Sequence, residues 1–119
     1  MIPTEAQEQK DLFRWAELMS KRYPELELLF HIPNGGSRHI VEAANLKAQG
    51  VRAGVPDIFL PVARLGYHGM FIEMKRRKGG RLSEAQKEWI CVLERNGYFA
   101  IVCAGWEEAV EAIESYLKK

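Results

Sequence analysis

The segment 70–76, Met-Phe-Ile-Glu-Met-Lys-Arg, constrains the fold more than any other part of the chain. It has the composition of a β-strand and lies between glycine-containing turns. Successive side chains on a strand point to opposite faces, so Glu73 and Lys75 share one face. The apolar residues of the alternate phase face the other way: Met70, Ile72 and Met74. The strand therefore offers one face to a core and a carboxylate and an ammonium group to the other side.

The segments around this strand predict a single α/β domain spanning 1–119, a small mixed sheet flanked by helices. Thr4 with Gln7, and Ser83 with Gln86, fit the capping box that opens a helix. Segment 98–103 is almost wholly apolar, so we expect it in the centre of the sheet. The expected helices cover 5–22, 39–49, 84–95 and 106–117, and the expected strands cover 26–32, 57–62, 70–76 and 98–103.

Composition indicates a folded protein without a membrane span. Of the 119 residues, 47% are hydrophobic, and no apolar run approaches the roughly 20 residues that cross a bilayer. The N-terminus lacks the features of a signal peptide, which predicts a cytoplasmic location. Cys91 and Cys103 lie within apolar patterns and are expected to be buried thiols. The three histidines show no ligand spacing, which argues against a zinc site.

A run of basic residues directly follows the central strand. The net charge is only +1, which argues weakly against a dedicated DNA-binding domain. A basic run is often just a solvated turn, but its position beside the charged strand favours phosphate binding. The residues of this run are Arg76, Arg77, Lys78 and Arg81.

A second candidate for anion binding is the turn and helix start that contain Asn34 and Arg38. Backbone N–H groups at a helix start favour an anion. The alternative is a turn residue with surface groups that bind nothing.

Asp57 and Glu73, on neighbouring predicted strands, form a candidate magnesium site. Mg²⁺ is typically bound by one or two carboxylates, with waters and substrate phosphates completing an octahedron. The backbone carbonyl of Met74 can add a further oxygen. Lys75 would then lie beside the attacking water and the phosphate, where it could orient or deprotonate that water or stabilise charge. The alternatives are a surface salt pair for Glu73 and Lys75, and a capping role alone for Gln86.

The first predicted helix carries two acids near its start. Glu5 and Glu8 both flank the N-terminal continuation of its apolar stripe, so either can point into the domain. Both are equally explained as first-turn acids favoured by the helix dipole.

Taken together, these segments resemble the VRR-NUC nucleases, a branch of the PD-(D/E)xK superfamily with a restriction-endonuclease-like core. The resemblance covers nearly the whole chain. It is carried by Gly-Val-Arg-Ala-Gly-Val-Pro-Asp at 50–57, Phe-Ile-Glu-Met-Lys at 71–75, and Leu-Ser-x-x-Gln-x-x-Trp at 82–89. Pro-Asn-Gly-Gly at 33–36 and the opening 4–9 also fit.

The resemblance implies a structure-selective DNA endonuclease that depends on Mg²⁺ or Mn²⁺. By motif position, Asp57 and Glu73 would be metal ligands and Lys75 the catalytic lysine. Gln86 would contact the site or a phosphate, and Glu5 is favoured over Glu8 as the helix glutamate.

The sequence departs from the family pattern at one position, and the resemblance also has an implication for the oligomeric state. The family's Val-Arg-Arg stretch reads Val-Arg-Ala at 51–53, which keeps Arg52 as a DNA contact but puts a second arginine contact in doubt. Small stand-alone members, largely of phage origin, resemble Holliday-junction resolvases in being homodimers. The alternatives are a nuclease or nickase without junction preference and a nucleic-acid-binding module without catalysis.

Overall fold

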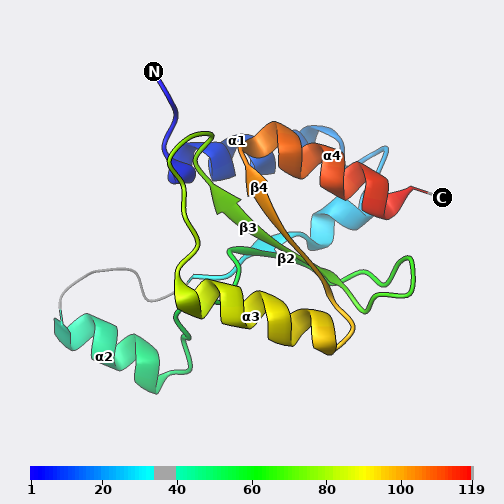
Figure 1. Ribbon diagram of the computed structural model, residues 1–119. Helices are drawn as coiled ribbons and strands as arrows, with labels where there is room; N and C mark the ends of the chain where they lie inside the picture. Colours follow the sequence, from blue (N-terminus) through cyan, green and yellow to red (C-terminus); the bar gives the residue numbers. More distant parts are fainter. Residues whose placement is uncertain (34–39, 119) are drawn as a thin grey trace.

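Strand β3 (Met70–Lys75) lies inside a four-stranded sheet with the order β1-β2-β3-β4 (Figure 1). The structure is a computed structural model and describes residues 1–33 and 40–118. Strands β1 (Phe30–His31), β2 (Ile58–Leu60) and β3 pair antiparallel, and β4 (Phe99–Ala104) runs parallel to β3. The parallel pair requires a crossover, which α3 (Glu84–Arg95) supplies.

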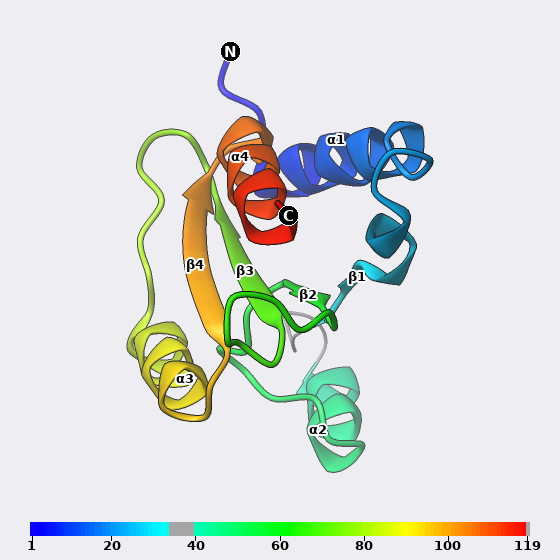
Figure 2. The ribbon, with the colours of Figure 1, turned by 90° about the vertical axis from the view of Figure 1, so that its right-hand side faces the viewer.

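The helices form a layer on each side of the sheet. Helices α1 (Glu5–Leu18) and α4 (Trp106–Leu117) cover one face, and α3 lies on the other (Figures 1 and 2). Helix α2 (Ile40–Ala48) projects away from the sheet in both views. The core fills the space under α1 and α4, and its most buried members are Leu12, Ile58, Leu60, Met70, Ile72, Met74 and Ile113. The apolar face of β3 is therefore the core face, as the alternation predicts.

The α/β class and both helix starts are confirmed. Thr4 and Ser83 cap α1 and α3, and the reciprocal capping box of Ser83 with Gln86 is complete. None of the helices in the described ranges is long and apolar enough to cross a membrane.

The segment 19–32 differs from its prediction. Helix α1 ends at Leu18 and not at 22, and the expected strand 26–32 is a 3₁₀ helix, η1 (Pro24–Leu28), followed by the short β1. Pro24 occupies the start of η1, where its fixed φ suits a helical turn and its missing N–H costs nothing.

Two further expectations about burial are wrong. Among the described strands β4 lies at an edge and not in the centre of the sheet. Its apolar character arises because α3 packs on one of its faces and α4 on the other. Cys103 on β4 is buried, but Cys91 on α3 is exposed.

Gly54 fixes the distance between the loop before β2 and the start of α3. Its φ is +94°, and a Cβ at this position would lie 2.8 Å from backbone and side-chain atoms of Ala85. Ala85 immediately precedes Gln86, and the loop leads directly to Asp57. Close packing at Gly54 therefore holds the loop that leads to Asp57 against the start of the helix that carries Gln86.

We expect Gly54→Ala to destabilise the protein more than Gly50→Ala. Both glycines have positive φ, which costs an alanine about 1–3 kcal/mol. Only Gly54→Ala adds overpacking of about 1–3 kcal/mol, because nothing lies within 4 Å of a Cβ at Gly50. Urea unfolding of both variants measures the difference. Equal losses would contradict the packing role of Gly54.

Candidate active site

The position of Asp57 follows from the pairing of β2 with β3. Ile58 pairs with Ile72, so the preceding Asp57 lies opposite Glu73. The Met74 N–H donates to Asp57 Oδ2 at 2.8 Å. On the other side, the Ile32 N–H donates to the Asp57 main-chain oxygen at 2.6 Å, and His31 Nδ1 lies 2.9 Å from the same oxygen. Both the backbone and the carboxylate of Asp57 are thus held in place.

Glu73 is the most unusual group in the sheet because its carboxylate is almost fully buried, with 1% of the residue exposed. Gln86 Nε2 donates to Glu73 Oε2 at 3.1 Å, and Lys75 Nζ lies 3.7 Å from the same oxygen. The second oxygen, Oε1, is buried and has no hydrogen-bond partner within the described residues. Buried polar atoms are normally satisfied, so Oε1 indicates a site built for a group from outside the chain.

Gln86 has two contacts at once. Its Oε1 accepts the Ser83 N–H at 2.8 Å, and its Nε2 reaches Glu73. The capping interpretation and the site interpretation of this glutamine are therefore both observed in the geometry. The start of α3 and the carboxylate of Glu73 share one side chain.

The electrostatics of the pair follow from burial. Desolvation raises the pKa of Glu73 to about 8, and the negative charge of Asp57, a hydrogen bond with Asp57 and the charge of Glu5 act in the same direction. Lys75 opposes them by lowering the pKa of Glu73. A divalent cation would remove the repulsion that the proton otherwise relieves.

The donor set suits a hard cation. The Lys75 carbonyl accepts the Gly105 N–H on the β4 side, so the backbone groups of the adjacent Met74 point the other way, toward Asp57. The Met74 carbonyl therefore lies on the Asp57 side of β3, and two carboxylates with one backbone carbonyl are ligands of the kind that Mg²⁺ takes from proteins. Within residues 1–33 and 40–118 no group of three or more His, Cys, Asp or Glu side chains is placed to hold a metal ion, so the candidate cation site rests on the pair Asp57 and Glu73 with the Met74 carbonyl.

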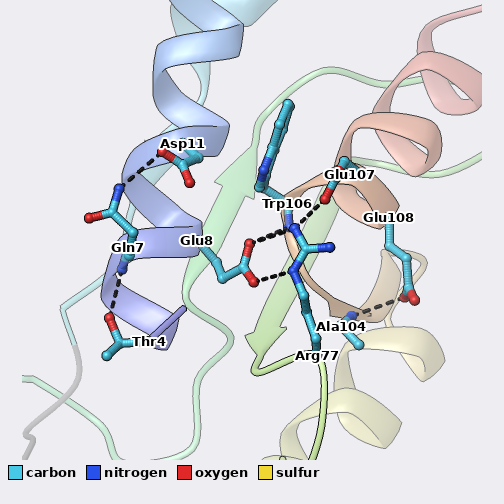
Figure 3. A network of polar contacts seen from close by, with 9 residues as sticks. All are labelled: Thr4, Gln7, Glu8, Asp11, Arg77, Ala104, Trp106, Glu107 and Glu108. Atoms are coloured by element: carbon cyan, nitrogen blue, oxygen red, sulfur yellow. Dashed lines mark hydrogen bonds and ion pairs between the residues drawn. The ribbon is translucent and has the colours of Figure 1, made fainter. Parts of the chain in front are cut away.

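The two candidate acids in the first turn of α1 have different surroundings. Glu8 is fully buried and binds Arg77 and the Trp106 N–H (Figure 3). Glu5 is exposed, but it lies close enough to contribute to the raised pKa of Glu73. Of the two, Glu5 is the one whose charge acts on the pKa of Glu73.

The predicted DNA-binding residues also divide. Arg52, Arg76, Lys78 and Arg81 are exposed, as phosphate contacts must be. Arg77 is different, because its guanidinium is bound by Glu8 and Glu107. The hydrogen bond with Glu8, and to a smaller extent the one with Glu107, raise the pKa of Arg77. Asn34 and Arg38 lie outside the described residues.

Comparison with known proteins gives the family. The VRR-NUC domain profile matches residues 2–107, and the chain belongs to this family, which is of nuclease type. A solved structure titled "VRR_NUC domain protein" is 35% identical, with a TM-score of 0.81, and the match covers 98% of this chain and 89% of that one. No curated protein matches the chain.

Two features of the site were not predicted from the sequence. One is the contact of His31 with Asp57, and the other is the Glu8–Arg77 ion pair. The pair joins residues 69 positions apart, so no local pattern could have revealed it.

The raised pKa of Glu73 predicts an unusual pH dependence of stability. Between the ordinary value of 4.5 and about 8 the folded protein binds the proton more tightly than the unfolded chain. In chelator, we therefore expect the free energy of unfolding to fall as pH rises through this window, by up to about 1.4 kcal/mol per unit of pKa difference. Glu73→Gln should remove most of this slope in urea unfolding series. Glu84→Gln, at an exposed acid of α3, is the control and should keep it. An identical slope in wild type and Glu73→Gln would exclude a buried titrating Glu73.

Proposed function

We propose that the protein is a DNA endonuclease that depends on Mg²⁺ or Mn²⁺ and selects branched structures such as four-way junctions. The buried and unsatisfied carboxylate oxygen of Glu73 is the observation that carries the proposal. It lies in a group with Asp57 and Lys75, beside an exposed basic run. Membership of a nuclease family supports the same chemistry.

Each residue of the candidate site has a distinct task in phosphodiester hydrolysis. Asp57, Glu73 and the Met74 carbonyl would hold the cation. When bound, such an ion activates water and neutralises charge on the phosphate. Lys75, whose side chain is only partly exposed beside Glu73, would donate hydrogen bonds to the attacking water and to the scissile phosphate. Gln86 keeps the Glu73 carboxylate in orientation, and Glu5 adds negative charge at the edge of the site.

The DNA would reach the site along the basic segment that follows β3. Arg76, Lys78 and Arg81 follow directly from Lys75 in the chain and are exposed. Arg52, on the loop leading to Asp57, is exposed as well. Contacts of this kind position the phosphate backbone without reading bases, which suits an enzyme that selects shape.

A homodimer would suit the junction substrate, because two symmetric sites can make paired cuts in opposing strands. Light scattering at the working concentration tests this part separately. A monomer that still cuts both strands would exclude the dimer without affecting the metal site.

The competing function is a nucleic-acid-binding module without catalysis. The paired carboxyl groups count against it, because the charge of Asp57 repels phosphate, and Glu73 adds to that repulsion once it is ionised, unless a cation is bound. A binder gains nothing from burying Glu73 next to a second acid. A nuclease without junction preference uses the same site, and only the substrate comparison separates it from our proposal.

The decisive measurement is cleavage of a labelled four-way junction beside linear duplex, flap and single-stranded DNA. We expect paired cuts in the junction with Mg²⁺ or Mn²⁺, none with chelator, and a reduction of several orders of magnitude in Lys75→Ala with folding and DNA binding retained. Equal cleavage of all substrates would remove the structure selectivity. Cleavage by Lys75→Ala at the wild-type rate would remove the mechanism, and binding without cleavage under either metal would favour the binding module.

The salt dependence of DNA binding should separate phosphate contacts from other basic residues. We expect Arg76→Ala and Lys78→Ala each to lower the slope of log K against log salt by about 1, because each removes one phosphate contact. Lys118→Ala is the matched control, since Lys118 follows α4 at the end far from Lys75. Unchanged slopes in the first two variants would exclude the basic segment as the DNA contact.

A further inference from the structure

The carboxylate of Glu8 is buried at the point where three elements meet (Figure 3). Arg77 Nε donates to Glu8 Oε2 at 2.7 Å, and an Arg77 Nη donates to Oε1 at 3.2 Å. The Trp106 N–H, at the start of α4, donates to Oε1 at 3.2 Å. Both oxygens of Glu8 are therefore satisfied, and a single carboxylate links α1, the end of β3 and the start of α4.

The neighbouring contacts strengthen this junction. Gly105, the N-cap of α4, has no side chain to cap the helix, so the carboxylate of Glu8 takes the place of a capping group. Glu107, in the first turn of α4, holds the same Arg77 guanidinium. Arg77 is thus fixed from two helices, although its side chain is 38% exposed and it lies in a segment of exposed basic residues.

The same junction lies next to two residues of the candidate site. Lys75 precedes Arg77 by two positions, and the Lys75 carbonyl accepts the Gly105 N–H at 3.1 Å. Glu5 lies three positions before Glu8 on α1, so both project from the same side of that helix. A shift of the Glu8–Arg77 pair would move the end of β3 and the first turn of α1 relative to Glu73.

We propose that the Glu8–Arg77 ion pair positions Lys75 and Glu5 against Glu73. The inference rests on the proposed nuclease function for its effect on catalysis. Neither residue contacts the reacting atoms, so both act through others. Arg77 accordingly belongs to the scaffold of the site and not to the DNA-binding segment. The effect should be large, because a displacement of about 1 Å in a catalytic group can cost about 100-fold in rate.

Two variants separate positioning from stability. Glu8→Gln keeps the shape but turns an amide toward Arg77. The double variant Glu8→Met with Arg77→Met replaces the pair by apolar side chains, a change that is often close to neutral for the ion pair itself, while the Trp106 N–H loses its acceptor and some stability with it. We expect kcat for junction cleavage to fall about 10-fold to 100-fold in both variants, with KM and DNA affinity within about twofold of wild type.

A matched control lies at the opposite end of β2 from Asp57. Glu25→Gln breaks the ion pair between Arg64 Nη and Glu25 Oε2, which are 2.5 Å apart and also partly buried. This variant should lose stability and keep the wild-type kcat. All rates are compared at one temperature well below every unfolding midpoint.

Several outcomes would overturn the inference. Wild-type kcat in the double methionine variant would reduce the pair to a structural role. A lower DNA affinity and salt slope in Arg77→Met, with kcat unchanged at saturating DNA, would make Arg77 a phosphate contact. If the wild type cuts no substrate, the proposed function fails and the inference is still tested by crystal structures of wild type and the double variant. Unchanged positions of Lys75 Nζ and Glu5 relative to Glu73 would then reject it.

Discussion

The structure depends on a carboxylate placed where a protein of this size least tolerates one. Glu73 lies on a strand paired on both sides, with 1% of its surface exposed and one oxygen without a partner among the described residues. Burying an ionised group costs several kcal/mol unless it is paired. Two neighbouring side chains compensate for this one group: the amide of Gln86, at the start of α3, and the ammonium of Lys75. The packing of this part of the sheet and the chemistry of the candidate site thus depend on the same buried carboxyl group.

Sequence reasoning succeeded where a local rule determines the result. The alternation along 70–76 identified the core face, and the capping signals at Thr4 and Ser83 located the starts of α1 and α3, although only Ser83 and Gln86 form the full capping box. Motif spacing brought Asp57, Glu73, Lys75 and Gln86 together, and the structure places these four in one cluster. It failed at 26–32, where an apolar composition fits a 3₁₀ turn as well as a strand. It failed again for β4, because burial under two helices imitates a central strand.

The remaining misses concern contacts between distant segments. Arg77 lies in a basic run, a position that predicts a phosphate contact. In the folded protein, however, Glu8 of the first helix binds its guanidinium. Glu5 and Glu8 have nearly the same helical projection, so only tertiary packing distinguishes the buried acid from the one near Glu73. A residue that is bound by a partner far along the chain leaves no periodic pattern in the sequence. A run of basic residues therefore does not show which of its members forms an internal ion pair.

The double contact of Gln86 has a consequence for how the protein responds to heat. Because one amide both accepts from the N-cap of α3 and orients Glu73, fraying of the first turn of α3 also releases the Glu73 carboxylate. The ends of helices fray at lower temperatures than whole domains unfold. Thermal inactivation should therefore begin at the first turn of α3, while the core beneath α1 and α4 is still intact, and it should reverse on cooling.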